Sequence, residues 1–407
     1  MSLSQDILTK MMELPNRGSG TVYEQKAGEY IKSVYNYLKI PYKEVDSKTI
    51  KNSLNNHLIL SFSLILLSIL VNFLNIIFIT LPVFIFTVLV YLRAFKLPFN
   101  LPLKFFKNST VSKNIYVDIP AKEQELNTIV ITSHYDTGND YGPLVNILGP
   151  IYNFIRSSQT DSTSSLKVPE YINNPLVISN LSLLLTLLAL FLPDNSAKFF
   201  FGLLAGTPLA IGIYLLAKSN KKYSPGALDN GVGTSLVVEL ASIISQNPFP
   251  NTRVIFANIA AEETLTRGTL PLLNSLNLNK LKTFIIDLDC IGEEEIMLIN
   301  SEPSYPLGLP VTYDSTFDVL SDFANEYLQG EFKMGDSPLF TDNQELLLNQ
   351  YRVTSLITTM PKNGYPTNYH NNKDTIEKIK WDKVEVVRNF VIEYLEFFDS
   401  ISKEVVF

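Results

Sequence analysis

Carboxylate and imidazole side chains follow three short apolar segments of the sequence, at points where buried strands would end. They are His134 and Asp136 after residues 128–132, Glu262 and Glu263 after residues 253–259, and Asp289 after residues 283–288. Two further candidates are Asp229, in a turn just before a helical pattern, and His370, with Asp374 behind it. Ligand sites in α/β folds gather at the carboxyl ends of strands. We therefore expect these side chains to meet at one edge of a sheet.

Side chains of these types are suited to bind two zinc ions. Zinc accepts imidazole nitrogen and carboxylate oxygen, and two ions ~3.5–4 Å apart need a bridging ligand and can share one water. Four carboxylates would repel one another strongly if they gathered without cations; they belong to Asp229, Glu262, Glu263 and Asp289. The pattern indicates a centre with two Zn²⁺ ions, and Co²⁺ or Mn²⁺ are alternatives because metal choice depends partly on supply.

Two more acids follow the histidines closely, Asp136 after His134 and Asp374 after His370. Acids at such positions commonly hold ring N–H groups or orient the ligand loops. We expect Asp136 and Asp374 to act in this way. Asp287 lies within the third apolar segment and competes with Asp289 as a metal ligand.

The apolar segments themselves predict the fold class. Residues 128–132, 253–259, 283–288 and 353–358 are short, β-branched and nearly continuous in apolar character, as in strands buried on both faces. Helical patterns separate or follow them at residues 233–246, 270–276, 315–329 and 381–401. This alternation predicts a three-layer α/β/α sandwich around a mostly parallel central sheet.

Two long uncharged regions predict four transmembrane helices in two hairpins. The first runs from Leu58 to Leu92, which is too long for one helix of ~20 residues and slightly short for two. The second contains two apolar stretches, 171–193 and 199–217, on either side of a polar turn. The predicted boundaries are 1–50 for the N-terminal helices of the α/β domain, 51–97 for hairpin one, 98–170 for the first part of the domain, 171–220 for hairpin two and 221–407 for the second part.

The amino-acid composition limits the classes of binding partner and the cellular location that we expect. Mean hydropathy is positive although 18% of residues are charged, which suits an integral, multi-pass membrane protein in contact with lipid. A net charge of −7 argues against nucleic acid as a partner. One cysteine excludes an internal disulfide framework. Lysine and arginine residues flank both hairpins on the side of the α/β domain, so we expect that domain to face the cytoplasm.

As a set, the motifs resemble the zinc aminopeptidase and glutamate carboxypeptidase family (clan MH metallopeptidases), which includes the bacterial leucyl aminopeptidases. The motifs H-x-D, D-N, E-E, D-x-x-G and a late H followed by D-T occur here in that order, at residues 134–136, 229–230, 262–263, 289–292 and 370–375. The resemblance covers nearly all of the chain outside the hairpins. It favours Asp289 over Asp287, because Asp289 begins the D-x-x-G motif. Hairpin two is an insertion between Asp136 and Asp229, and residues 341–343 read Thr-Asp-Asn where the family often has Ser-Asp-His.

The resemblance also implies roles for individual residues. Asp229 would bridge two metal ions, one completed by His134 and Asp289 and the other by Glu263 and His370. Glu262 would be the general base that takes a proton from the bridging water. Tyr369 stands where the carboxypeptidase branch has a tyrosine that stabilises the tetrahedral oxyanion.

The expected function is hydrolysis of peptide bonds by a membrane-anchored di-zinc enzyme that removes N-terminal residues from a peptide substrate. Three alternatives stay open. A carboxypeptidase or a glutaminyl cyclase-like enzyme would share the fold, although two intact metal sites favour hydrolysis over the cyclase's single-zinc chemistry. A non-catalytic membrane scaffold or receptor would have lost ligands that this chain retains.

Overall fold

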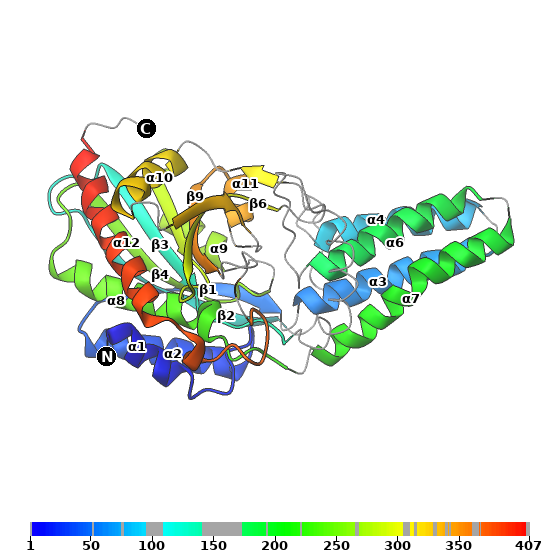
Figure 1. The fold of residues 1–407 in the computed structure, drawn as a ribbon, viewed down its shortest axis with the longest axis horizontal. Coiled ribbons are helices and arrows are strands. Elements are labelled where there is room, and N and C mark those ends of the chain that lie inside the picture. The colour runs from blue at the N-terminus through cyan, green and yellow to red at the C-terminus, as the bar shows by residue number, and fades with distance from the viewer. Residues whose placement is uncertain are drawn as a thin grey trace.

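The fold is taken from a computed structural model of the chain. It describes residues 2–50, 53–74, 77–94, 109–140, 173–192, 194–219, 222–264, 268–303, 310–312, 316–328, 332–337, 341, 343–359, 366 and 368–403. The described residues form an α/β domain and an elongated helical bundle that projects from it (Figure 1).

A nine-stranded sheet forms the centre of the α/β domain. Its strands are β1 (Lys43–Ile50), β2 (Ser109–Ile119), β3 (Asn127–His134), β4 (Thr252–Ile259), β5 (Thr283–Leu288), β6 (Glu295–Pro303), β7 (Pro310–Thr312), β8 (Phe332–Asp336) and β9 (Arg352–Thr359). The order across the sheet is β1-β2-β4-β3-β5-β9-β6-β7, and β8 pairs with β6. The four predicted strands are therefore confirmed as the adjacent strands β4, β3, β5 and β9 of this order.

Parallel pairing holds in the middle of the sheet and again between β6 and β8. Strand β3 pairs in parallel with β4 and β5, and β5 pairs in parallel with β9. On both sides the next strands, β2 and β6, run antiparallel to their neighbours β4 and β9. The prediction of a mostly parallel sheet was therefore wrong, and the sheet is mixed. The flanking strands escaped prediction because their polar residues, as in Lys43–Ile50, break the apolar run on which strand prediction relied.

Helices cover both faces of the sheet, as the three-layer prediction requires. Alternating residues of β3 separate the two cores: Ile129 and Ile131 belong to one cluster, and Val130 belongs to the other. The larger cluster joins the sheet to α1 (Leu3–Met11), α2 (Val22–Tyr37), α8 (Val232–Gln246), α10 (Thr316–Tyr327) and α12 (Trp381–Ile401). The smaller cluster joins it to α9 (Thr269–Leu276) and α11 (Asn343–Leu348).

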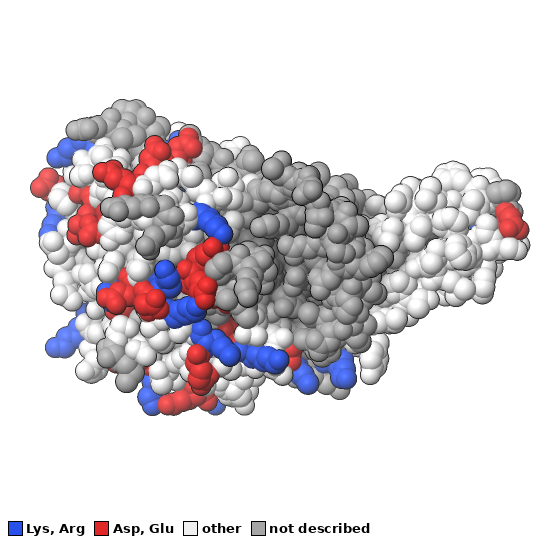
Figure 2. Space-filling view, viewed as in Figure 1, with Lys and Arg blue, Asp and Glu red and all other residues white. Residues whose placement is uncertain are grey.

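The predicted hairpins are present as helix pairs and pack into one four-helix bundle (Figure 1). They are α3 (Ser53–Asn72) with α4 (Ile77–Ala94), and α6 (Asn173–Leu190) with α7 (Asn195–Ser219). Hairpin two turns just before Asn195, slightly earlier in the chain than predicted. Most of the exposed large apolar side chains of the described residues lie on this bundle, for example Phe78 at 88% and Leu70 at 64% exposure. Figure 2 shows the bundle almost free of charged side chains except near its tip.

Length and apolar character together identify the helices that could cross a membrane. Among the described residues two helical segments are long and apolar enough, Asn195–Lys218 in α7 and Ala227–Gln246, which contains α8. The second is 89% buried and is a core helix of the α/β domain. The other bundle helices, α3, α4 and α6, have 20, 18 and 18 residues, and their fully described apolar stretches are Leu58–Asn72, Phe78–Val90 and Asn180–Leu190. The prediction of four transmembrane helices is therefore not supported, since among the fully described residues only α7 of the bundle meets the criterion.

Close packing between α3 and α7 depends on glycine. A Cβ atom at Gly212 of α7 would lie 2.5 Å from the Cε2 atom of Phe62 on α3, so the Phe62 ring lies closer to the α7 backbone than a side chain at position 212 permits. Phe62 itself is fully buried in the bundle. This contact makes Gly212 a test of the packing.

We expect Gly212→Leu to lower the thermal unfolding midpoint of the detergent-solubilised protein. An overpacked core typically costs ~1–3 kcal/mol, and here the added side chain meets a ring that is already buried. Ala210→Leu, two residues away on the exposed side of α7, is the matched control and should change the midpoint little. Equal midpoints for the two variants would contradict the described α3–α7 contact.

Candidate active site

The carboxyl ends of three neighbouring strands bring most of the predicted ligands to one level. His134 is the last residue of β3 and pairs with Ile259, the last residue of β4. The next strand, β5, pairs Asp287 with Thr132, which puts Asp289 level with His134. Glu262 and Glu263 follow β4 by a few residues, so three strand ends deliver side chains to the same edge.

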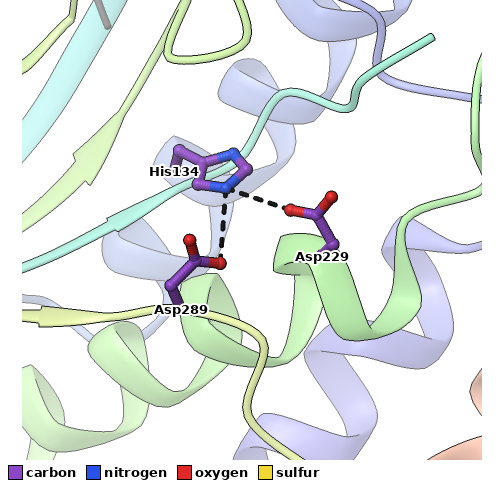
Figure 3. Close-up of side chains that lie close together, drawn as sticks. All are labelled: His134, Asp229 and Asp289. Carbon is purple, nitrogen blue, oxygen red and sulfur yellow. Dashed lines mark ion pairs between the residues drawn. The ribbon is translucent and has the colours of Figure 1, made fainter. Parts of the chain in front are cut away.

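His134, Asp229 and Asp289 form the first cluster (Figure 3). The Nε2 atom of His134 lies 3.2 Å from Oδ1 of Asp229 and 3.7 Å from Oδ1 of Asp289. All three side chains are buried. Asp229 comes from the turn Ala227–Gly231 that leads into α8, and its peptide bond to Asn230 is cis.

Asp229, Glu263 and His370 form the second cluster, which shares Asp229 with the first. The Nε2 atom of His370 lies 3.1 Å from Oδ2 of Asp229 and 3.0 Å from Oε1 of Glu263. Each oxygen of the Asp229 carboxylate thus faces a different histidine. In Figure 3 the second oxygen points away from His134. The structure therefore brings together all five residues predicted as metal ligands, with Asp229 in the middle.

The charges at this centre are not balanced by the protein. Burial lowers the pKa of His370, but the charge of Glu263 and the hydrogen bond to Asp229 outweigh it and raise that pKa to about 10. Burial raises the pKa of Glu263, with the charge of Asp229 adding to the effect. Oδ1 of Asp289 and Oδ2 of Asp229 are buried, and among the described residues they face only the nearby histidine nitrogens, at 3.7 and 3.1 Å.

This donor set fits metal ions. Imidazole nitrogen and carboxylate oxygen are zinc ligands, and buried acceptors without donors are what a bound cation would satisfy. A proton shared between imidazole and carboxylate would satisfy only part of the set. The geometry therefore supports a metal centre at the shared Asp229, and the number of ions is considered below.

Glu262 lies beside the first histidine without belonging to the central clusters. Its carboxylate, that of Glu263 and the His134 ring have ligand atoms within 4.8 Å of one another. Asp136 fixes this turn, because its Oδ1 and Oδ2 atoms accept the backbone N–H groups of Glu262 and Glu263, each at 3.1 Å. The Ser19 hydroxyl also donates to Asp136. Asp136 thus acts on the position of the acids and, through its carbonyl oxygen 3.2 Å from Nδ1, on His134.

Asp374 holds the loop that carries Asp229. Its Oδ1 accepts the N–H group of Leu228 at 2.7 Å, and its Oδ2 accepts that of Asp229 at 3.1 Å. Asp374 is buried. Its predicted role as a loop-orienting acid therefore agrees with the geometry, although it supports Asp229 rather than the His370 ring.

The fully buried Arg17 was not singled out from the sequence. Its guanidinium donates to the carbonyl oxygens of Tyr135 at 2.8 Å, Pro225 at 2.8 Å and Gly226 at 2.6 Å. These carbonyls lie on the two chain segments that flank hairpin two. Arg17 therefore joins the His134 and Asp229 loops across the insertion. No pattern in the sequence around Arg17 indicates these contacts.

Glu24 and Gly138 are two further residues that the sequence pattern did not indicate. Glu24 accepts hydrogen bonds from the backbone of Gly20 at 2.7 Å and Ala261 at 3.0 Å, and from the Ser112 hydroxyl. It therefore supports the Glu262 turn from behind. Gly138 lies against the second cluster, where an added Cβ would be 2.5 Å from Nε2 of His370.

Other candidates from the sequence have different positions. Asp287 accepts a hydrogen bond from Thr132 at 2.9 Å and lies outside both clusters, so Asp289 is the aspartate at the site. The Tyr369 ring stacks on the His370 ring with centroids 4.0 Å apart, and its role as an oxyanion donor stays a prediction. Of the altered family motif at residues 341–343, Asp342 lies outside the described residues.

Comparison with known proteins agrees with this centre. Residues 216–395 match peptidase family M28. No curated protein matches the chain in sequence. Among solved structures, a Zn-dependent exopeptidase from Parabacteroides distasonis has a TM-score of 0.52 at 12% identity, covering 96% of each chain. A leucine aminopeptidase precursor from Bacteroides thetaiotaomicron has 0.53 at 12% identity, covering 96% of this chain and 95% of its own. A glutaminyl cyclase from Porphyromonas gingivalis has 0.54 at 11% identity, covering 97% and 96%.

The chain thus has the fold that zinc-dependent exopeptidases and glutaminyl cyclases share. Residues 216–395, somewhat less than half of the chain, match the model of peptidase family M28, and this match together with the shared fold supports a zinc metallopeptidase. The family resemblance inferred from the motifs is confirmed.

We expect Asp374→Asn to weaken zinc binding by ~10–100-fold, the usual cost of losing a residue that orients a ligand. The substituted amide offers one acceptor to the two N–H groups that Asp374 now receives. Competition with a chromophoric chelator would measure the affinity. Asp399→Asn is the control, since Asp399 also accepts a backbone N–H, that of Asn251 at 2.8 Å, away from the site. An unchanged affinity in Asp374→Asn would contradict the role.

A pH effect on stability is expected from Glu24. Burial, reinforced by the charge of Asp136, raises the pKa of Glu24 from an ordinary 4.5 to about 8. Between these values the folded state binds more protons than the unfolded state, so the free energy of unfolding of the metal-free protein should fall as pH rises from about 4.5 to about 8.

Thermal unfolding of the metal-free protein between pH 5 and 9 would measure this effect. Glu24→Gln should have a flatter profile than the parent, whatever its absolute stability, because the titrating group is gone. The half-exposed Glu125→Gln is the control and should keep the parental slope. A parental slope in Glu24→Gln would contradict the assignment.

Proposed function

We propose that the protein is a di-zinc aminopeptidase, in which Asp229 bridges the ions, His134 and Asp289 complete one site, and Glu263 and His370 complete the other. The observation that carries the proposal is the shared carboxylate: its two oxygens face the two histidines at 3.2 and 3.1 Å. A bridging ligand is what a co-catalytic pair requires. Cobalt or manganese could occupy the same donors.

Bound metal ions would polarise the substrate carbonyl and lower the pKa of a shared water. The residues of the chain do the rest. Glu262 lies close enough to this centre to take the water's proton and to pass it to the leaving amine. Asp136 holds Glu262 and Glu263 by their backbone N–H groups, so the base and its neighbouring ligand are fixed by one carboxylate. The Tyr369 hydroxyl is proposed to donate to the developing oxyanion.

Glu262→Gln should lower the kcat of peptide cleavage by ~10²–10⁴-fold, the usual contribution of a general base. The assay would incubate purified protein and zinc with a mixture of free and N-acetylated peptides, and mass spectrometry would identify the products. Stepwise loss of N-terminal residues from the free peptides alone is the expected result. Removal of C-terminal residues would instead indicate a carboxypeptidase, and cyclised N-terminal glutamine would indicate a glutaminyl cyclase.

The zinc content of each purified variant distinguishes the proposed general base from the proposed metal ligands. Glu262→Gln should keep two zinc ions per chain, whereas Glu263→Gln should bind fewer, because it removes a ligand of the second site. Glu294→Gln is the control for a glutamate away from the clusters, since Glu294 pairs with Lys380. One zinc ion in the parent protein would contradict the di-zinc proposal.

We also propose that the four-helix bundle anchors the enzyme in a membrane, with 1–50, 98–170 and 221–407 forming the peptidase domain outside it. Support comes from α7, which is long enough to cross, and from the apolar side chains that all four helices expose. Such a surface is costly in water and is matched by lipid.

The domain is proposed to face the cytoplasm, because basic residues such as Arg93 and Lys218 lie at the domain-side ends of the helices. Protease treatment of sealed right-side-out and inside-out vesicles would test this. The peptidase domain should be degraded only in inside-out vesicles. Degradation in right-side-out vesicles would reverse the orientation, and release of the protein by carbonate washing would contradict membrane insertion.

A further inference from the structure

The metal centre is tied closely to the end of the bundle. Helix α7 ends at Ser219, and three residues later the Lys222 carbonyl accepts the backbone N–H of Asp140 at 3.0 Å. Gly138, two residues before Asp140, lies against His370 and Glu263. Ser224 donates its N–H to the Gly138 carbonyl at 3.0 Å, so this short pairing is held at both ends.

The number of residues along this path sets an upper limit on the distance between the end of α7 and the metal centre. Consecutive Cα atoms are ~3.8 Å apart, so the steps from Ser219 to Lys222 and from Asp140 to Gly138, with the contacts that join them, span less than roughly 30 Å. The membrane-crossing candidate in α7 ends at Lys218. If the proposed anchor is correct, the metal centre therefore lies within roughly 30 Å of the hydrocarbon boundary.

A second connection restricts movement of the domain away from this position. Strand β1 ends at Ile50, which pairs with Ser109 at the start of β2, and α3 begins at Ser53. The sheet and the bundle are thus joined through β1 as well as through α7. The two connections are at different places in the domain. Strand β1 is at one edge of the sheet, whereas Lys222 pairs beside the metal ligands.

We propose that the physiological substrates are polypeptides that are themselves held in the membrane, and that the enzyme trims their N-terminal tails to a fixed residual length. The proposal rests on the aminopeptidase activity and the anchor proposed above. A substrate in the same membrane meets the site at a far higher effective concentration than a dissolved one. An extended chain spans ~3.3 Å per residue, so a tail shorter than about nine residues would not reach a site at the limiting distance.

The test uses the full-length protein with zinc in liposomes. The substrates are one peptide sequence with a free N-terminus, attached through its C-terminus to an acyl chain in versions with 4, 8, 12 and 16 residues outside the bilayer. Each version is placed either in the vesicles that hold the enzyme or in separate vesicles. The same peptide without the acyl chain is added to a third set, and a fourth set is dissolved in detergent.

Cleavage in shared vesicles at least about tenfold faster than in separate vesicles is expected, with the difference lost in detergent. The longer tethered peptides should all stop at one residual length of at most about nine residues, while the dissolved peptide is trimmed further. Equal rates in shared and separate vesicles, or residual lengths that vary with the length of the starting peptide, would overturn the proposal. A dissolved peptide that is cleaved in these cases leaves the aminopeptidase intact, whereas no cleavage in any set removes both.

Discussion

Uncompensated negative charge in a buried space is the constraint on which the rest of the site depends. Asp229, Glu263 and Asp289 converge on two imidazoles, which are their direct side-chain partners among the described residues. Carboxylates gathered in this way repel one another and lose solvation. Cations resolve the conflict, and a folded protein can keep such acids in place only if other contacts hold the loops. That requirement explains why a second ring of buried polar residues surrounds the first.

The surrounding residues act on backbone rather than on metal. Asp136, Asp374 and Glu24 each accept backbone N–H groups from the turns that carry the acids. The Arg17 guanidinium donates hydrogen bonds to the carbonyl oxygens of Tyr135 and Gly226. A few charged groups thus fix these loops, and three of them, Asp136, Glu24 and Arg17, each bond to two or more chain segments. This arrangement also tolerates a large insertion, because the segments that flank hairpin two are joined to each other through Arg17 and through the Asp140–Lys222 pairing.

Prediction from sequence succeeded where a short apolar strand delivers a polar residue at its end. His134, Glu263 and Asp289 were found in this way, since burial on both faces leaves a continuous apolar run. It failed at the antiparallel strands that flank the sheet, as in β1, whose lysines and acids form ion pairs at the surface. Arg17, Glu24 and Gly138 were missed for another reason: their importance comes from contacts with residues distant in the chain, and no local pattern records those contacts. The absence of charge indicated the helices of the bundle, and α6, at Asn173–Leu190, is a little shorter than the uncharged stretch 171–193.

Hairpin two separates His134 from Asp229 along the chain, although their side chains are 3.2 Å apart in the folded protein. On the proposed topology, the ribosome completes the first ligand before α6 and α7 exist and the second only after both have entered the bilayer. The metal centre can therefore assemble only after hairpin two has been synthesised, so the position of the insertion in the chain sets the order in which the anchor and the centre form.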